Sequence, residues 1–177
     1  MSAVYVLMFC RITIILVFAL SLGGKILDIV NFQEAIVDFR LLPTRWSKAA
    51  AWTFLGVESA IVLLMAIGGS VLLIGFLLAM ALLTVFSAAL VLVLQRDIRV
   101  TCNCFGRTER RISPYDVARN VLLILCGLVG VWALVSPLQS LSEVEIILIG
   151  LMAVCFVVLV TNLADVVGTL RQPFHVG

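Results

Sequence analysis

The sequence alternates between long apolar runs and short polar segments, and this pattern predicts five helices that cross a membrane. Crossing a hydrocarbon core of about 30 Å takes roughly 20 apolar residues at a rise of about 1.5 Å each. Runs of that length cover about residues 4–27, 47–67, 71–94, 114–135 and 144–163, and a tight turn at Gly68 to Ser70 separates the second from the third. Since a bilayer offers the backbone no hydrogen-bond partners, each run must be helical, which predicts an all-α, multi-pass transmembrane helical bundle.

A shorter amphipathic segment, "NFQEAIVDFRLLP" at residues 31–43, lies between the first two runs. Asn31 can cap a helix whose third residue is Glu34, an arrangement that resembles a capping box. Pro43 stops the pattern. We therefore expect a short helix in the membrane interface, with an irregular loop as the alternative. Apolar residues recur in this segment at helical spacing, namely Phe32, Ala35, Ile36 and Phe39.

The composition fits a chain dissolved in lipid. Hydrophobic residues make up 63% of the 177 residues and charged residues only 12%, whereas soluble domains are about one quarter charged. The mean hydropathy is +1.24, and a net charge of +2 is too small to indicate nucleic-acid binding. We expect a single integral membrane domain over residues 1–177. The first run starts at Val4 with no basic residue before it, which favours a retained helix over a signal peptide.

Basic residues are distributed unevenly about the five predicted helices. Only Arg11 lies deep within a run, and the side that holds the N-terminus has no Lys or Arg. The positive-inside rule then places the N-terminus outside and the C-terminus in the cytoplasm. All the other basic residues fall on the second side: Lys25, Arg40, Arg45, Lys48, Arg96, Arg99, Arg107, Arg110, Arg111, Arg119 and Arg171.

Two charged residues lie deep within apolar runs, Arg11 in the first and Glu58 in the second. A charge at this depth costs a few kcal/mol, so each needs a partner. Their depths, counted from the ends of antiparallel helices, agree within a turn. We therefore predict that they pair, with separate bonds to backbone carbonyls as the alternative. Such a pair could set the helix register, bind a quinone carbonyl or hold a proton.

The five cysteines fall into two groups. Three lie in apolar runs and are expected to be small buried side chains: Cys10, Cys126 and Cys155. Cys102 and Cys104 lie instead in the polar segment "VTCNCFGRTERRISPYDVARN" at residues 100–120, which leads through Ser113 and Pro114 into the fourth helix. The nearby arginines and the helix N-terminus both favour a thiolate.

Three interpretations of the Cys102–Cys104 pair stay open on residues alone. A disulfide between them closes a very small ring, and a strained disulfide suits thiol–disulfide exchange better than structural stapling. Binding of a soft metal is disfavoured because the only histidine is His175 and no further ligands have zinc-like spacing. The third interpretation is a purely structural turn.

A set of short motifs follows in a characteristic order along the first four predicted helices. They are Arg11, "GGKILD" with Lys25, Phe32, "FRLLP" at residues 39–43, Glu58, "CNCFG" at residues 102–106, Ser113, and "ARN" with Arg119 and Asn120. In this order and spacing the chain resembles the MauE family of methylamine-utilisation membrane proteins, which are related to DoxX-like proteins. The resemblance covers about three quarters of the chain.

The resemblance implies a bacterial inner-membrane protein that acts with a thioredoxin-like periplasmic partner (MauD-like). Together they are needed for making the beta (small) subunit of methylamine dehydrogenase, which is rich in disulfides and carries a quinone derived from tryptophan. The resemblance also implies that Cys102 and Cys104 are a redox pair, the site of a thiol–disulfide oxidoreductase. It assigns no metal and leaves several polar residues in supporting positions without roles: Arg11, Lys25, Glu58, Arg119 and Asn120.

Two other classes of function stay open, a membrane chaperone or transport component without redox turnover, and a DoxX-like oxidoreductase subunit linked to a quinone. The side of the cysteine pair is a further open question. Methylamine dehydrogenase matures in the periplasm, whereas the charge distribution places Cys102 and Cys104 in the cytoplasm. An electron relay through membrane cysteines (Cys10, Cys126 or Cys155), a loop that dips into the bundle, or a failure of the charge rule would each resolve this.

Overall fold

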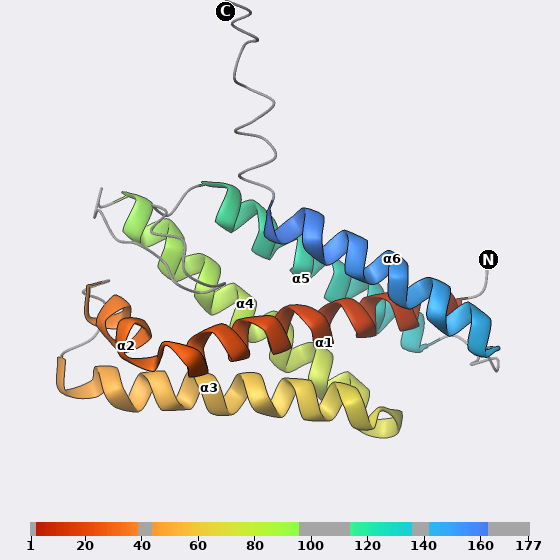
Figure 1. Cartoon of the computed structure of the whole chain (residues 1–177), viewed down its shortest axis with the longest axis horizontal. Helices are drawn as coiled ribbons and strands as arrows, with labels where there is room; N and C mark the ends of the chain where they lie inside the picture. Colours follow the sequence, from red (N-terminus) through yellow and green to blue (C-terminus); the bar gives the residue numbers. More distant parts are fainter. Residues whose placement is uncertain (1–2, 39–43, 96–113, 136–141, 163–177) are drawn as a thin grey trace, which may run out of the picture.

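The computed structural model describes residues 3–38, 44–95, 114–135 and 142–162, which form a bundle of helices (Figure 1). A short helix α2 follows α1, and a 3-10 turn η1 joins α3 to α4. All five long helices are apolar and long enough to cross a membrane, and the described ranges contain no strand. The predicted all-α fold class and five spans are therefore confirmed. The elements are α1 (Ala3–Leu27), α2 (Ile29–Asp38), α3 (Thr44–Ile67), η1 (Gly69–Val71), α4 (Leu72–Gln95), α5 (Pro114–Leu134) and α6 (Glu143–Thr161).

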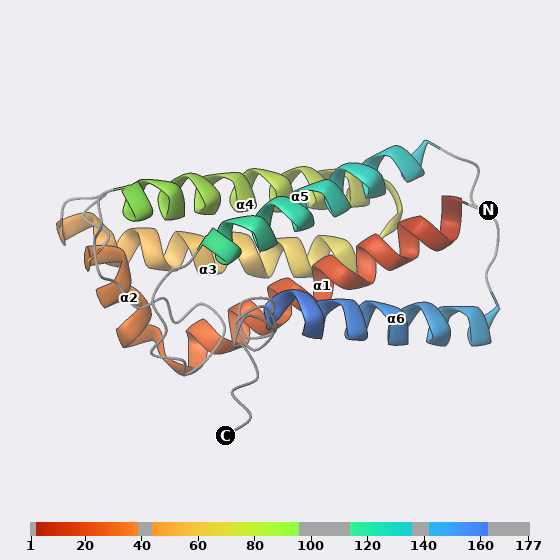
Figure 2. The same ribbon diagram turned by 90° about the horizontal axis from the view of Figure 1, so that it is seen from above.

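Four of the long helices close into a ring, and the fifth lies outside it. Both α1 and α4 pack on α3 and on α5, so these four helices form the ring. Helix α6 packs chiefly on α1, along the outer side of the bundle (Figures 1 and 2). We call the end that holds Ala3, η1 and Glu143 the turn end. The opposite end, where α2 lies and where α4 ends and α5 begins, is the α2 end (Figure 1).

The centre of the ring depends on two glycines of α5. A Cβ atom at Gly130 would lie 2.5 Å from Cε1 of Phe76 on α4, and one at Gly127 would lie 2.8 Å from Cγ of Met80. Phe76 is completely buried. Small residues let membrane helices approach closely where no water drives them together, and α5 fits between α1 and α4 for this reason.

The outward faces of the long helices are apolar, as expected of surfaces in contact with lipid. Three tryptophans are exposed, and two of them stand near opposite ends of the bundle, Trp46 in the first turn of α3 and Trp132 in the last turn of α5. Tryptophan is enriched at both water interfaces of a bilayer, so these positions fit a membrane-spanning orientation of the bundle. Large exposed aliphatic side chains cover the faces between them, among them Leu20, Leu63, Leu77, Leu128 and Leu151.

The segment between the first two spans is the helix α2, as predicted, and not an irregular loop. Phe32 and Ile36 are buried against Ala51 and Leu55 of α3. The predicted capping box at Asn31 and Glu34 is wrong, because the helix already begins at Ile29. Asn31 lies inside it, and its Nδ2 donates to Oδ2 of Asp28, 2.7 Å away, just before the first helical residue.

Candidate functional site

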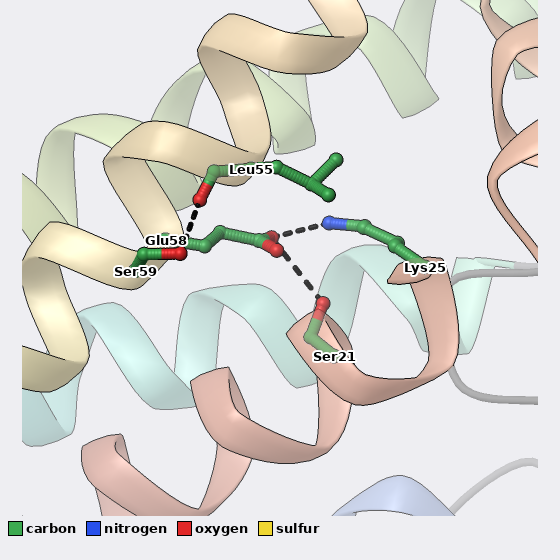
Figure 3. Close-up of polar contacts among 5 residues, drawn as sticks. All are labelled: Ser21, Lys25, Leu55, Glu58 and Ser59. Atoms are coloured by element: carbon green, nitrogen blue, oxygen red, sulfur yellow. Dashed lines mark hydrogen bonds and ion pairs between the residues drawn. The ribbon is translucent and has the colours of Figure 1, made fainter. Parts of the chain in front are cut away.

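The most buried charged side chains of the described residues are Lys25 and Glu58, which form an ion pair inside the ring. Lys25 is 1% exposed and Glu58 is 2% exposed, and Nζ of Lys25 donates to Oε1 of Glu58. Ser21 Oγ donates to the same oxygen at 3.3 Å. Figure 3 shows Lys25 and Ser21 of α1 both pointing at the Glu58 carboxylate of α3. The pair therefore joins two helices that lie next to each other in the ring.

The sequence of α1 explains why these two residues reach one carboxylate. Ser21 and Lys25 are four residues apart, so they lie on the same face of the helix. Helical side chains lean toward the helix N-terminus. The long side chain of Lys25 therefore runs back along α1 and meets Glu58 beside Ser21.

Two aromatic rings complete the surroundings of the Lys25 ammonium. Nζ lies 5.0 Å from the ring centroid of Phe32 on α2 and 4.8 Å from that of Phe86 on α4. A ring face attracts a cation, and more strongly where water is excluded. Four helices thus contribute to one site, which we call the polar centre: Ser21, Lys25, Phe32, Glu58 and Phe86.

The polar centre leaves one acceptor unused. Glu58 Oε2 is buried and has no hydrogen-bond partner among the described residues. A charge in hydrocarbon is stable only where a counter-charge and hydrogen bonds replace its water. Lys25 supplies the counter-charge and Ser21 one hydrogen bond, and both of them act on Oε1.

Arg11 does not pair with Glu58, and the predicted ion pair between them is wrong. Nε of Arg11 donates to the carbonyl oxygen of Met65 at 2.7 Å, and Nη2 donates to that of Ala66 at 2.9 Å. These carbonyls lie in the last turn of α3, where no further turn of helix uses them. The guanidinium also fills the space beside Gly68, where a Cβ atom would lie 2.8 Å from Nη2.

The prediction of an Arg11–Glu58 pair compared the depths of the two residues by counting from the helix ends. It failed because α1 and α3 do not end at the same level. Arg11 stands in the third turn of α1 yet lies beside the last turn of α3. Helix α1 therefore extends past the end of α3 at the turn end. Glu58, more than two turns before the end of α3, meets the second half of α1 instead.

Arg119 and Asn120 lie near the start of α5. Nη1 of Arg119 is 3.7 Å from Oδ1 of Asp116, one turn earlier on the same helix. Asn120 is buried on the face of α5 that also buries Leu123 and Gly127. Of the supporting residues named from the sequence, the structure brings Lys25 and Glu58 together, while Arg11 lies beside the last turn of α3 and Arg119 and Asn120 lie near the start of α5.

Cys102 and Cys104 lie outside the described residues. Of the three cysteines expected to be buried, Cys10 is buried and Cys126 is half-buried. The prediction is wrong for Cys155, which is exposed on the outer side of α6, where lipid replaces protein neighbours. The described residues contain no group of three or more His, Cys, Asp or Glu side chains placed to hold a metal ion.

Sequence reasoning missed two members of the polar centre. Ser21 could have been found, because it lies one turn before Lys25 on the same face of an apolar helix. Phe86 carries no local signal, since its role depends on the packing of α4 beside α1. Phe32 was recognised as part of the apolar face of the short helix and of a family motif, and its place beside Lys25 was not predicted.

Five apolar spans, outward faces of aliphatic side chains and a buried ion pair define a multi-pass helical membrane protein. The family model described as "Methylamine utilisation protein MauE" matches residues 3–133. The chain therefore belongs to the MauE family. No curated protein and no solved structure matches the chain. The matched range contains Arg11, the whole polar centre, and the Cys102 and Cys104 positions.

Proposed function

We propose that this chain is a bacterial inner-membrane protein that assists maturation of the disulfide-rich beta (small) subunit of methylamine dehydrogenase. Its proposed chemistry is thiol–disulfide exchange at Cys102 and Cys104. The observation that carries the proposal is the family match over residues 3–133, because that range includes both cysteines. The family's name supplies the methylamine context, and the client subunit comes from the resemblance of the motifs.

The exchange step needs a thiolate and a partner disulfide. One cysteine attacks a disulfide sulfur of the partner, forms a mixed disulfide and releases the partner's second sulfur as a thiolate. The other cysteine then attacks the mixed disulfide and closes the Cys102–Cys104 bond, leaving the partner reduced. Nearby arginines in the sequence, including Arg107 and Arg110, support ionisation of the attacking thiol. We infer that the partner is a thioredoxin-like periplasmic protein of the MauD type. Direct exchange with it needs Cys102 and Cys104 on the periplasmic side, whereas the charge distribution places them in the cytoplasm, and the labelling experiment below decides between the two sides.

The proposed topology has the N-terminus outside and the α2 end in the cytoplasm. Lys25, Arg45, Lys48 and Arg119 all belong to helix segments at the α2 end, which supports this orientation. A membrane-impermeant thiol reagent, applied to right-side-out and to inverted vesicles, tests it. Labelling of Cys102 and Cys104 only in inverted vesicles is the expected result. Labelling only in right-side-out vesicles would place the pair in the periplasm and overturn the orientation.

Trapping of a mixed disulfide tests the exchange chemistry. Cys102→Ser and Cys104→Ser are each expressed with the thioredoxin-like partner, and membranes are run on non-reducing gels. At least one variant should give a reducible adduct, because removal of the resolving thiol lengthens the life of the intermediate. Cys155→Ser is the matched control, expected to give no adduct and normal maturation. If neither loop variant gives an adduct and both support maturation, the protein acts as a chaperone or transport component without redox turnover.

A further inference from the structure

Helix α3 has an outward surface that changes from basic to apolar along its length. Arg45, Lys48 and Trp52 are all exposed, and their spacing of three, four and seven residues places them on one side of the helix. The same side continues through Gly56, where a Cβ atom would meet no described atom of another helix within 4 Å, to the exposed Leu63. We call this surface the α3 face: Arg45, Lys48, Trp52, Gly56 and Leu63.

The two cations of the α3 face are not neutralised by the described part of the chain. The other described cations, Arg11, Lys25 and Arg119, bond to backbone carbonyls or lie beside a carboxylate. Arg45 and Lys48 have no ion-pair or hydrogen-bond partner among the described residues. They also lie in the first two turns of α3, at the positive end of the helix dipole, and the first turn has no acidic residue. The positive charge at this end of the face therefore suits an anionic group from outside the chain.

The length of the α3 face determines what kind of molecule can cover it. Trp52 lies roughly 10 Å along the helix from Arg45 at about 1.5 Å per residue, and Leu63 lies further along the same side. The face therefore runs from the membrane interface, where the exposed Trp46 lies, into the hydrocarbon. A water-soluble acidic protein would reach only the basic end. An anionic phospholipid has a phosphate for the cations and acyl chains for the apolar part, so it fits the whole face.

A second copy of this chain fits the α3 face less well than a lipid does. Two copies in one membrane, related by a two-fold axis along the membrane normal, would meet through the same surface on each copy. Arg45 and Lys48 would then face the same two cations across the contact, and like charges at an interface oppose association. The charge of the face therefore favours an anionic occupant over a second copy.

We propose that the α3 face is a binding site for an anionic phospholipid. Arg45 and Lys48 bind the phosphate, and the guanidinium of Arg45 can donate two parallel N–H bonds to it. Trp52 and the open surface at Gly56 lie along the acyl chains. A basic residue near a membrane surface gives about a fivefold preference for an anionic lipid. The site does not depend on exchange at Cys102 and Cys104.

Fluorescence quenching of a single tryptophan tests the site. The full chain with Trp46→Phe and Trp132→Phe keeps only Trp52 and is reconstituted into equimolar phosphatidylglycerol and phosphatidylcholine. Bromine, a quencher, is carried on the acyl chains of one lipid or of the other. Brominated phosphatidylglycerol should quench Trp52 more strongly, corresponding to a preference of about fivefold or more. The matched control keeps only Trp132, at the turn end, and should be quenched equally by both lipids.

Arg45→Gln and Lys48→Gln, added together to the chain that keeps only Trp52, should remove the preference. Circular dichroism checks that this variant stays helical, and high sodium chloride should weaken the preference without any substitution, because salt screens exposed charges. Equal quenching by both lipids, or a preference that survives the two substitutions, overturns the proposal. Absence of quenching by either lipid also overturns it, because protein would then cover Trp52. If inorganic phosphate removes the preference where sodium chloride of equal ionic strength does not, the cations bind free phosphate and the lipid assignment is wrong.

Discussion

The two cations of α1, Arg11 and Lys25, satisfy their charge in different ways. Lys25 lies against the carboxylate of Glu58 on α3 and against the aromatic rings of Phe32 on α2 and Phe86 on α4. Arg11 has no carboxylate partner among the described residues and donates instead to the carbonyl oxygens of Met65 and Ala66. Both cations belong to one helix, so the difference comes from what each one meets on the facing helices.

The place along α3 that each cation meets decides whether backbone carbonyls or a carboxylate can satisfy its charge. In the middle of a helix every carbonyl already accepts a hydrogen bond, so a cation there needs a carboxylate. The last carbonyls of a helix have no partner within it and carry the negative end of the helix dipole. Arg11 meets α3 at such an end, whereas Lys25 meets α3 at Glu58, more than two turns before it.

Loss of Glu58 is expected to have the largest effect. Glu58→Ala leaves the Lys25 ammonium buried without a counter-charge, which should lower the free energy of unfolding by about 3–5 kcal/mol. The measurement is the unfolding temperature and the yield of folded protein in detergent. Adding Lys25→Met removes the stranded charge and should recover part of the loss. A double variant as poor as the sum of the single ones would show that the pair does not interact. Glu34→Ala, at an exposed position of α2, is the control.

Arg11→Met is expected to have the second-largest effect on the free energy of unfolding. It removes two hydrogen bonds from a charged donor to the end of α3, an expected loss of about 2–3 kcal/mol in the same assays. Combined with Glu58→Ala it should be additive, because the two sites share no recorded contact. Recovery of stability in that double variant would show that Arg11 and Glu58 interact directly in the wild-type protein. The stability of the Arg11→Lys variant should lie between those of the wild type and of Arg11→Met, because an ammonium group lacks the planar, forked arrangement of donors that a guanidinium has.

Phe86→Leu should cost about 1 kcal/mol, because it removes one of the two rings that face the Lys25 ammonium. The unfolding temperature is compared in the wild-type chain and in a Lys25→Met chain. The loss should be smaller without the cation. An equal loss in both chains would mean that Phe86 contributes only packing and that the ring does not belong to the polar centre.

The smallest expected effect belongs to Ser21→Ala. Its hydroxyl donates a 3.3 Å bond to Glu58, and a single such bond contributes roughly 0.5–1 kcal/mol. Ser59→Ala is the matched control on α3, because the Ser59 hydroxyl bonds only to the Leu55 carbonyl of its own helix at 2.8 Å (Figure 3). Equal unfolding temperatures for wild type and Ser21→Ala would show that the pair needs no help from the hydroxyl.

The helices could be predicted because the bilayer sets their length and forces regular backbone, so apolar runs alone gave all five spans. The partner of Glu58 could not be predicted in this way. A residue count gives depth only relative to its own helix end, and α1 extends past α3 at the turn end. Phe86 was likewise beyond reach, because its role depends on which helices become neighbours in the ring.

The outer position of α6 has a consequence for the side of the membrane on which the chain emerges after its last helix. The family match ends at residue 133, and the ring of α1, α3, α4 and α5 closes without α6. Helix α6 is attached to the ring through α1, where Phe9 and Phe156 meet edge to face at 5.4 Å. Four crossings bring a chain back to its starting side, and a fifth takes it across. A reporter fused after Val135 and one fused after Asn162 should therefore be found in opposite compartments while the ring stays intact.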